Sequence, residues 1–411
     1  MKILIVSQYF YPEQFRINDV CSALVKRGHD VTVLTGLPNY PSGEIYQGYE
    51  DKGNTEEIIF GARVVRCNLR PRHRGTNNLI RNYLSFVNQS KKIIKRLDKD
   101  YEIIYVYGVS PVTQAIPAIK YKKKVNKKAK ILYYCCDLWP EAVRGEQNGH
   151  RQLSKHNPVY LIAKSITKKI YKKVDFIINK CDEFAQYNEK VCKVNTNKQT
   201  TIFEHAEDFY LNVPEDPVDN GIVDFFFLGN IGKAQNCDQI IEAFSKLSSS
   251  NKTALHFVGD GSEAERLKVF VKNKKIEQHI HFHGKCTISE INNYYAVADV
   301  CVLALSNRTA TGFTIPAKLA SYMAAARPIV ASINGSSSQI INEANCGYTA
   351  NADDVDGLAN AMQKCVDYPN NLIQMGINGR KFFNEHFTID LFIDNLLNTI
   401  RRVVNNESCF N

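Results

Sequence analysis

The stretch from Ser306 to Ser332, SNRTATGFTIPAKLASYMAAARPIVAS, decides the fold of the chain around it. The apolar run 300–305 just before it predicts a buried strand, and a polar loop follows. Pro316 then opens a predicted helix over 317–325, and Pro-Ile-Val-Ala begins a second strand. A strand, a loop, a helix and a returning strand form the βαβ unit from which parallel sheets are built.

The start of this helix suits an anion. Its first backbone N–H groups have no helical partner and carry a partial positive charge, which favours phosphate. Proline at the first helical position is already restricted to helical geometry and loses no hydrogen bond there. We expect Lys318, one turn into the helix, to reach the same anion. The stretch is equally consistent with an ordinary βαβ connection that binds nothing.

Length and composition are typical of a globular protein with two or three domains. The chain has 411 residues, of which 44% are hydrophobic and 23% charged. The apolar run in the opening MKILIVSQYF is too short for a signal peptide or a membrane span, and no other window is apolar enough to span. The twelve cysteines are scattered without a CxxC pair, which favours reduced thiols over a disulfide or zinc framework.

Charge is unevenly distributed along the chain. Residues 1–200 contain 35 Lys and Arg against 18 Asp and Glu, a net charge of +17, whereas residues 201–411 carry −7. Such an asymmetry indicates that the first half faces a polyanion, which is a nucleic acid, an anionic lipid or a diphosphate-linked substrate. A lysine-rich but merely solvated surface would give the same counts.

Two α/β alternations are predicted, joined by an acidic segment with two prolines. The fold class is therefore α/β, with two Rossmann-like domains facing across a cleft. Ligands of such sheets bind at the carboxyl ends of the strands, and a cleft between two domains is the default site. The predicted parts are an acceptor-binding domain 1–204, a linker 205–221, a second domain 222–388, and a C-terminal helix 389–411 that can cross back to the first domain.

A basic amphipathic helix is predicted over about 77–97, after the arginine-containing loop 70–74. Such a helix can lie on an anionic membrane surface, with Tyr83, Phe86 and Val87 inserted among the lipids. It can equally pack on its own sheet with a wet basic face. The sequence leaves both alternatives open.

One local pattern recurs in the second half of the chain. A buried strand ends in glycine or a small polar loop, and a helix begins directly after it. This occurs at Gly229, Gly259, Gly284 and Gly312. Glycine allows close backbone approach and each helix start offers N–H groups, so the four ends together predict a pocket for a nucleotide diphosphate. Neither GxGxxG nor GxxxxGK[ST] is present, which disfavours dinucleotide and P-loop sites.

Seven segments together carry a resemblance to a known family. They are SQYFYPEQFRIND, TGLPNYPSGEIYQGY, CCDLWPE, FLGNIGKAQN, FVGDG, FHGK and TIPAKLASYMAAARPIVAS, and the resemblance extends from the first residue to about residue 347. The chain resembles retaining glycosyltransferases of family 4 with the GT-B fold. It is most similar to the branch that transfers N-acetylated deoxy-amino sugars, such as N-acetyl-L-fucosamine (L-FucNAc), in bacterial O-antigen and capsule synthesis.

The resemblance implies that the second domain holds a UDP-sugar. The implied donor-binding residues are Gly229, Asn230, Lys233, Gly259, Asp260, Lys285, Cys286, Thr314, Ile315, Pro316, Lys318 and Ser321. Among them, Asn230, Lys233 and Lys318 would neutralise the diphosphate together with the helix start at Pro316.

The sequence departs from the family pattern at three positions. Most relatives carry two glutamates eight residues apart, which bind the donor sugar and the ribose. Counted back from Pro328, these positions hold Phe313 and Ser321 here. Many relatives also carry histidine where this chain has Cys136, directly before Asp137.

The chemistry of retaining transfer tolerates these losses. The leaving phosphate itself can take the acceptor proton, so that the protein mainly positions the partners and stabilises the departing charge. Asp137 and Glu141, on a strand-to-helix turn, are the candidate catalytic residues, although a helix cap and a surface carboxylate are equally consistent with them. The candidate acceptor-binding residues, which follow the first strand, are Gln8, Tyr9, Glu13, Arg16 and Asn18.

The predicted function is transfer of a sugar from a UDP-sugar to a polyprenyl-diphosphate-linked saccharide, on the inner face of the cytoplasmic membrane. No metal or other cofactor is expected, because the Asp-X-Asp triplets 98–100 and 354–356 lie among polar residues at helix edges. Two alternatives remain. One is a UDP-sugar epimerase of the same two-domain shape, and the other is a non-catalytic protein that binds a nucleotide-sugar or nucleic acid.

Overall fold

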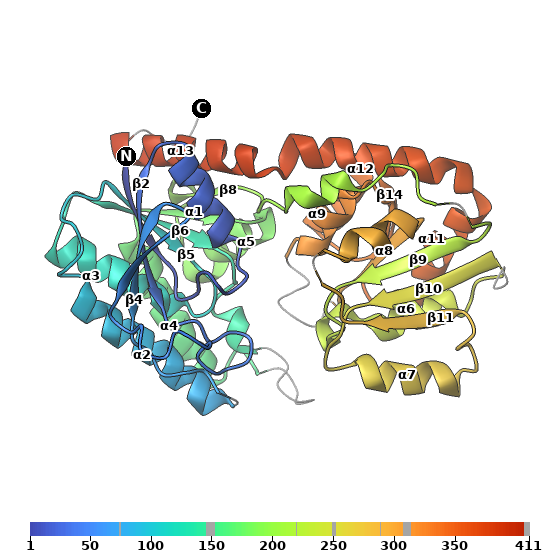
Figure 1. Ribbon diagram of the computed structural model, residues 1–411, viewed down its shortest axis with the longest axis horizontal. Helices are drawn as coiled ribbons and strands as arrows, with labels where there is room; N and C mark the ends of the chain where they lie inside the picture. The colour runs from blue at the N-terminus through green and yellow to red at the C-terminus, as the bar shows by residue number, and fades with distance from the viewer. Residues whose placement is uncertain are drawn as a thin grey trace. The chain divides into compact units, whose positions relative to one another are not determined.

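The computed structural model describes residues 1–73, 75–144, 153–218, 220–248, 252–287, 289–306 and 314–406. It divides into two compact units (Figure 1). Unit 1 comprises Met1–Phe203 and Phe392–Asn411, and unit 2 comprises Glu204–Leu391. The boundary at Phe203 lies next to the predicted domain end at residue 204, and a second boundary falls within the last helix.

Unit 1 is built on a sheet in the order β3-β4-β2-β1-β5-β6-β7-β8, in which every pair is parallel except β3 with β4. After their first residue, the central strands β1, β5 and β6 are apolar or aromatic, as expected for strands that are covered on both faces. The strands are β1 (Lys2–Val6), β2 (Asp30–Gly36), β3 (Glu56–Ile59), β4 (Ala62–Cys67), β5 (Ile103–Tyr107), β6 (Lys130–Cys135), β7 (Phe176–Asn179) and β8 (Gln199–Thr201).

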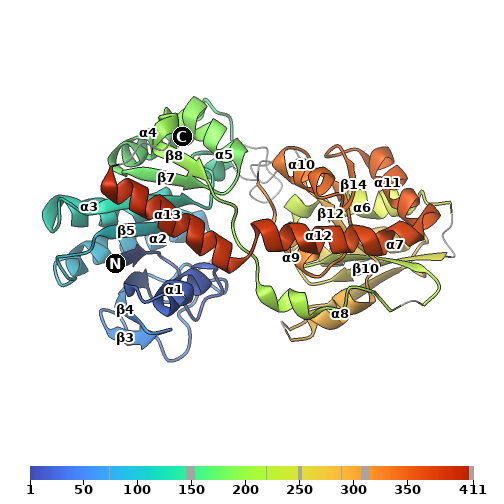
Figure 2. The same ribbon diagram turned by 90° about the horizontal axis from the view of Figure 1, so that it is seen from above.

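Helices cover both faces of this sheet (Figures 1 and 2). Those of unit 1 are α1 (Ile17–Lys26), α2 (Thr76–Ile93), α3 (Ile116–Lys124), α4 (Pro158–Lys173), α5 (Asp182–Tyr187) and α13 (Ile389–Asn405), with short turns η1 (Val112–Ala115) and η2 (Glu141–Arg144). Helix α13 packs on β6, where Phe392 meets Tyr134 edge to face with ring centroids 5.5 Å apart. Its apolar residues recur at helical spacing and are buried, so this face belongs to the unit 1 core.

Unit 2 contains a parallel sheet in the order β11-β10-β9-β12-β13-β14. Its strands are β9 (Val223–Leu228), β10 (Thr253–Val258), β11 (Ile280–Gly284), β12 (Val300–Ala304), β13 (Ile329–Ser332) and β14 (Gly347–Ala350). Its helices are α6 (Cys237–Phe244), α7 (Ala264–Asn273), α8 (Ile291–Val297), α9 (Ala317–Ala324), α10 (Ser336–Glu343), α11 (Val355–Asp367) and α12 (Leu372–His386), with short turns η5 (Asp208–Asn212) and η6 (Lys233–Gln235).

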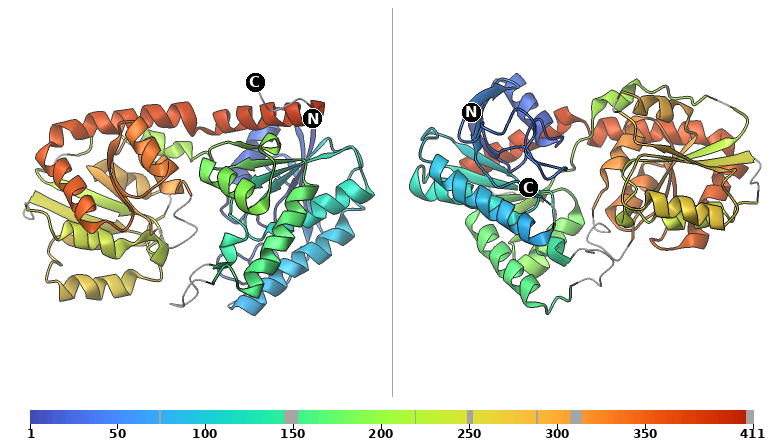
Figure 3. Two further views of the ribbon diagram at one scale, coloured as in Figure 1. Left: turned by 180° about the vertical axis from the view of Figure 1, so that it is seen from behind. Right: turned by 60° about the horizontal axis from the view of Figure 1, so that its bottom comes forward.

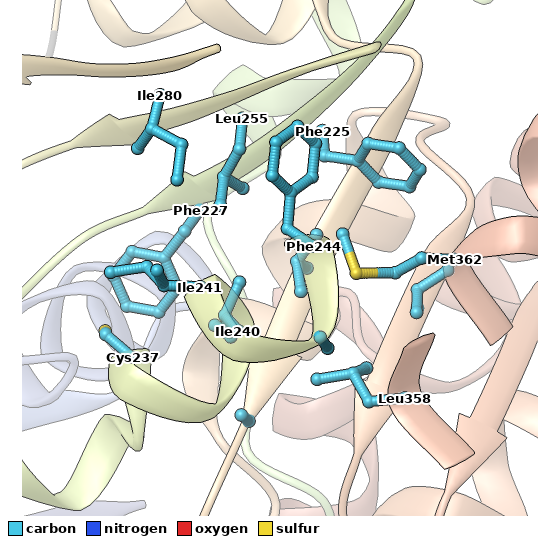
Figure 4. Packing of buried hydrophobic residues seen from close by; sticks show 14 of the residues in the cluster. Phe225, Phe227, Cys237, Ile240, Ile241, Phe244, Leu255, Ile280, Leu358 and Met362 are labelled. Atoms are coloured by element: carbon cyan, nitrogen blue, oxygen red, sulfur yellow. The ribbon is translucent and has the colours of Figure 1, made fainter. Parts of the chain in front are cut away.

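Apolar side chains from the sheet and from α6 and α11 form the core on one face of unit 2 (Figure 4). Phe225 and Phe227 of β9 lie against Ile241 and Phe244 of α6, and Met362 of α11 closes the layer. Residues at alternate positions of β9 point to this face, which is the period of an extended strand. The strands are thereby fixed in place up to their C-terminal ends.

The segment predicted as a linker is fastened to unit 2 by two arginines. The buried Arg327 donates from Nη1 to the carbonyl oxygen of Glu215 at 2.9 Å and from Nη2 to that of Pro214. Arg380 donates to the carbonyl oxygen of Val213 at 2.7 Å and, from Nε, to that of Ala324 at 2.9 Å. Residues 213–215 therefore form part of the folded unit.

The structure departs from the sequence predictions at several element ends. Pro316 has extended backbone angles, φ −71° and ψ 139°, and caps α9 instead of occupying its first turn. Helix α2 ends at Ile93, four residues before the predicted end. Helix α12 and strand β14 were not predicted. Phe313 and the loop residues before it lie outside the described residues.

The apolar residues expected to enter a membrane from α2 are part of the core, which corrects that expectation. Phe86 and Val87 are buried, and Tyr83 is half-buried. The exposed apolar side chains of α2 are Ile80 and Leu84. In the part of the chain that the structure describes, no helix combines the length and the hydropathy needed to cross a membrane.

We predict that Arg327→Leu destabilises the protein by about 2–4 kcal/mol, because it leaves the carbonyl oxygens of Pro214 and Glu215 without their charged donor. Denaturant unfolding measures the loss, and limited proteolysis should show faster cleavage near residue 215. Arg401→Leu, at an exposed arginine on α13, is the control and should change stability by less than about 0.5 kcal/mol. Equal stability of the two variants would show that the hydrogen bonds from Arg327 to this segment do not contribute to the free energy of unfolding.

Candidate active site

A cavity of about 440 Å³ opens in unit 2 at the C-terminal ends of β9, β10 and β11. This is the edge at which parallel α/β sheets bind ligands. The lining residues are Gly229, Asn230, Val258, Gly259, Asp260, Gly261, Lys285, Cys286 and Ile291. Six of the twelve predicted donor-binding residues are thus brought together in one cavity.

Two glycines make this edge possible. Gly229 and Gly259 have φ angles of +127° and +138°, which side-chain-bearing residues rarely adopt. A Cβ atom on Gly259 would lie 2.0 Å from the carbonyl oxygen of Gly229, so no side chain fits between these two strand ends. The backbone itself therefore forms this wall of the cavity, as the sequence predicted.

Lys318 lies beside Gly229, where a Cβ atom would approach the lysine Cε to 2.7 Å. Its Nζ sits over the ring of Phe227, 3.6 Å from the centroid, and donates to Oε1 of Gln235 at 2.9 Å. Burial lowers the pKa of this amine to about 7. Among the described residues no carboxylate forms an ion pair with it. Within the described part of the chain, the amine next to the cavity therefore lacks a counter-anion.

The other predicted donor residues have different positions. Lys233 is exposed, begins η6 and does not line the cavity. Ser321 is buried and its hydroxyl donates to the carbonyl oxygen of Ala317, one turn back in α9, at 3.3 Å. Thr314 is half-buried, with its carbonyl oxygen accepting from the Ser337 hydroxyl at 3.4 Å. Ile315 and Pro316 are half-buried next to it.

In unit 1, Asp137 follows β6 and is partly exposed. Its Oδ2 accepts a hydrogen bond from the backbone N–H of Ser110 at 2.7 Å. The Ser110 hydroxyl in turn accepts from Nε1 of Trp139 at 3.1 Å. The carboxylate is thus fixed from one side by the loop after β5, while the residue remains open to solvent.

Glu141 has a different environment. Its Oε1 accepts from the hydroxyls of Tyr160 and Tyr187 at 2.9 and 2.8 Å, and its Oε2 accepts from Nη1 of Arg144 at 2.8 Å. Burial raises the pKa of this carboxyl, but the bonds from Arg144, Tyr187 and Tyr160 outweigh burial and lower it. Glu141 joins η2 to α4 and α5, so of the two catalytic candidates Asp137 is the one with room for a substrate.

The predicted acceptor residues form an internal network. Gln8 is fully buried, and its Nε2 donates to Oδ1 of Asn82 at 2.7 Å. Asn82 donates to Oδ1 of Asn39 at 3.3 Å, and Gln114 accepts from the backbone N–H of Gln8 at 3.0 Å. These four buried amide side chains link the segments that follow β1, β2 and β5 to helix α2. Tyr9, which follows Gln8, is also buried.

Glu13 is a second buried residue that links two loops in the same region. Its Oε1 accepts from the backbone N–H groups of Asn39 and Tyr40 at 2.9 and 2.8 Å, and burial raises its pKa to about 7. Asn18 donates to the Glu13 carbonyl oxygen at 2.8 Å, whereas Arg16 caps α1 and is half-buried. Direct contact of this set with an acceptor stays a prediction.

Both Asp-X-Asp triplets are engaged in the folded units. Asp98 and Asp100 pair with Lys2 at 2.8 and 2.9 Å. Asp354 caps α11 by accepting from the Gly357 N–H at 2.8 Å, and Asp356 pairs with Lys246 at 2.5 Å. These contacts account for the acidic triplets as structural groups.

Sequence reasoning missed the amides Asn39, Asn82 and Gln114. Asn82 follows Arg81 in a helix with many polar residues, Gln114 follows Thr113, and no spacing relates the three amides. Their common feature is complete burial, which only the fold reveals.

Comparisons with known proteins agree with this architecture. Residues 223–367 match the family model described as Glycosyl transferases group 1. A candidate colanic acid biosynthesis glycosyl transferase, WcaI of Escherichia coli (strain K12), is 24% identical over 341 residues, which cover 79% of this chain and 81% of that protein. Most of unit 2 therefore matches the family model of group 1 glycosyltransferases.

Two solved structures share the fold of the whole chain. Sucrose-phosphate synthase from Thermosynechococcus elongatus has a TM-score of 0.75 at 16% identity, covering 99% of this chain and all of the other. Anabaena HepE in complex with UDP has a TM-score of 0.70 at 12% identity, covering 98% of this chain and all of the other. The chain has the GT-B fold, and the predicted fold class is confirmed.

We predict that Lys318→Met stabilises the protein at pH 6 by roughly 2 kcal/mol or more, and much less at pH 10. The folded-state pKa is depressed to about 7 from 10.5, so the unfolded chain binds the extra proton between these values. The wild type should gain stability as pH rises through this window, and the variant should not. Urea unfolding from pH 6 to 10 measures both slopes, and identical slopes would contradict a buried, unpaired amine.

Proposed function

We propose that the protein transfers a sugar, with retention of configuration, from a UDP-sugar to a lipid-linked saccharide in the synthesis of a bacterial surface polysaccharide. The observation that carries the proposal is the glycine-walled cavity at the C-terminal edge of unit 2, which lies inside the segment that matches group 1 glycosyltransferases. Solved complexes of the structural neighbour HepE contain UDP, UDP-glucose or UDP with glucose.

The residues at the cavity suit the leaving group. Backbone approaches closely at Gly229 and Gly259, and the Lys318 amine beside them becomes a cation once an anion offsets its burial. Lys285, an exposed lysine on the cavity wall, adds a second positive charge. Charge that develops on a departing diphosphate would be stabilised here, which is the main task of a transferase of this kind. No metal is part of the proposal.

Asp137 is the proposed catalytic residue of unit 1. Its carboxylate is oriented by the Ser110 N–H and the residue remains partly exposed, so a sugar hydroxyl can donate to it. Asp137 would orient that hydroxyl, while the leaving phosphate takes the proton. The name of the Escherichia coli relative refers to colanic acid, and we extend this to an O-antigen or capsule with an N-acetylated deoxy-amino sugar such as L-FucNAc as the donor sugar.

Helices α2 and α4 form the proposed membrane-facing surface on the inner face of the cytoplasmic membrane. They lie side by side, both packing on η1 (Figures 1 and 3). Apolar side chains are exposed on both helices, which together with the basic residues of unit 1 suits an anionic interface. The exposed apolar residues are Ile80 and Leu84 of α2 and Val159, Leu161, Ile162 and Ile166 of α4.

The decisive experiment incubates purified protein with UDP-sugars, first alone and then with a polyprenyl-diphosphate-linked saccharide. We expect a stable donor until the acceptor is added and an α-linked product from an α-linked donor. Asp137→Asn should fold, bind UDP and lose at least about 100-fold in turnover, because the amide cannot accept the same charge-assisted bond. Asp182→Asn, at the start of α5, is the control and should keep its turnover.

Other outcomes identify the alternatives. Epimerisation of the donor without acceptor would favour the epimerase. Binding of UDP without turnover of any donor would favour a non-catalytic binding protein. Full activity of Asp137→Asn would leave Asp137 as a loop-fixing residue only.

We predict that the wild type sediments with vesicles containing anionic lipid at low salt and is released at high salt, since each basic residue near the surface contributes about 1 kcal/mol. The double variant Ile162→Asp/Ile166→Asp should reduce the bound fraction about tenfold, because it places two carboxylates on the exposed face of α4. Val269→Asp, at an exposed apolar residue of α7 in unit 2, should not. A wild type that stays in the supernatant at low salt would contradict membrane attachment.

A further inference from the structure

A cluster of aromatic rings supports Arg72 at the C-terminal edge of the unit 1 sheet. The Arg72 guanidinium lies over the ring of Tyr40, 5.3 Å from its centroid. Tyr40 packs on Tyr9 and Phe15, with ring centroids 5.8 and 5.3 Å apart, and Tyr9 stacks on Phe15 at 5.0 Å. Rings from the segments that follow β1 and β2 thus hold a cation that belongs to the loop after β4.

The backbone of this loop is fixed as well. Oδ1 of Asn39 accepts from the Arg72 N–H at 3.1 Å, and Nδ2 of Asn82 donates to the Arg70 carbonyl oxygen at 2.6 Å. Asn39 and Asn82 are fully buried members of the amide network. The position of the Arg72 side chain is therefore set at both ends, by the amides and by Tyr40.

The amide network reaches from Asn82 through Gln8 and Gln114 to the loop that holds Asp137, and Tyr83 adjoins this network. It follows Asn82 on α2 and is half-buried. Burial raises the pKa of the Tyr83 hydroxyl, Arg72 opposes this rise, and the Asp137 charge adds to it. Both charges thus act on one hydroxyl. Within the described residues, no salt bridge neutralises Arg72 or Asp137.

We infer that Arg72, Tyr83 and Asp137 bind the acceptor as a sugar phosphate, with its phosphate on Arg72 and a free hydroxyl of the sugar near Asp137. A guanidinium pairs with phosphate in a bidentate manner, and a carboxylate accepts from a hydroxyl. The Tyr83 hydroxyl can donate to or accept from the part of the ligand that joins the phosphate to the sugar. The assignment rests on the proposed transferase function and adds Arg72 and Tyr83, which lie outside the predicted acceptor set.

The chain offers its own reporter for a binding test. Trp139 is the single tryptophan, and its Nε1 donates to the Ser110 hydroxyl, whose residue also binds Asp137 through its N–H. We propose to titrate N-acetylglucosamine 1-phosphate and phosphate-free N-acetylglucosamine while following Trp139 fluorescence. Saturating UDP keeps the unit 2 cavity occupied during both titrations.

Arg72→Met should weaken binding of the sugar phosphate about tenfold or more and leave binding of the phosphate-free sugar unchanged, because the variant loses only the phosphate contact. Tyr83→Phe, which removes one oxygen and keeps the ring, should weaken both sugars about threefold. The matched control is Arg96→Met, at an exposed arginine just beyond the end of α2, and it should bind like the wild type.

Wild-type affinity for the sugar phosphate in a folded Arg72→Met variant would overturn the inference. If that variant does not fold, wild-type affinity of Tyr83→Phe for both sugars would overturn it. A short-chain prenyl-diphosphate sugar that binds more tightly than the free sugar phosphate, still through Arg72, would assign a lipid-linked source, and equal affinity a free one. Arg72-dependent binding without transfer from any UDP-sugar would support the inference and contradict the proposed function.

Discussion

Parallel strand pairing is the constraint on which the rest of the structure depends. Strand β1 lies between β2 and β5 with all three in parallel register, Ile3 opposite Val31 and Ile103, so their C-terminal ends meet at one edge. Several loops must then leave the same narrow region, and their polar backbone groups need partners there. Unit 1 meets this need with the buried amides of Gln8, Asn39, Asn82 and Gln114, which hydrogen-bond one loop to the next. Unit 2 meets it with glycines that let strand ends approach so closely that no Cβ fits.

The elements that sequence patterns predicted well are the ones this constraint makes apolar. Strands covered on both faces, such as 103–107 and 300–304, consist almost entirely of buried residues, so their composition alone identifies them. Helix α12 was missed for the opposite reason. It contains Gly376 and Gly379, which lower helix propensity. A Cβ on Gly376 would lie 2.1 Å from the Ala326 carbonyl oxygen, so glycine is required there by packing against a segment 50 residues earlier in the chain. Local helix propensity does not reflect such a long-range contact.

The candidate site was predictable to the same extent. The glycine strand ends and their cavity follow from local sequence, because each glycine belongs to its own strand and the sheet brings the ends together. Sequence could not rank equivalent residue types. Lys233 and Lys318 each follow a glycine-containing loop, yet Lys233 is exposed, whereas Lys318 is half-buried with its amine over the ring of Phe227. Asp137 and Glu141 lie four residues apart, yet Glu141 is occupied by Tyr160 and Tyr187, which lie 19 and 46 residues away. Partners at such separations decide whether a carboxylate is structural or available.

The second domain has Phe313 and Ser321 where the family pattern that it resembles has two glutamates. Ser321 occupies one of those positions, but it is buried and its hydroxyl is turned to the Ala317 carbonyl oxygen of its own helix. A hydroxyl bonded in this way cannot take over the two acceptor oxygens of a carboxylate. At the cavity, Asp260 accepts from the Gly261 N–H at 2.7 Å and keeps a second carboxylate oxygen, and Asn230 is exposed beside it. Under the proposed function, recognition of the donor would therefore move from helix α9 to the loops after β9 and β10. Lys318 would remain on α9 next to Gly229, where the diphosphate makes its amine a cation that stabilises charge as the bond to the sugar breaks.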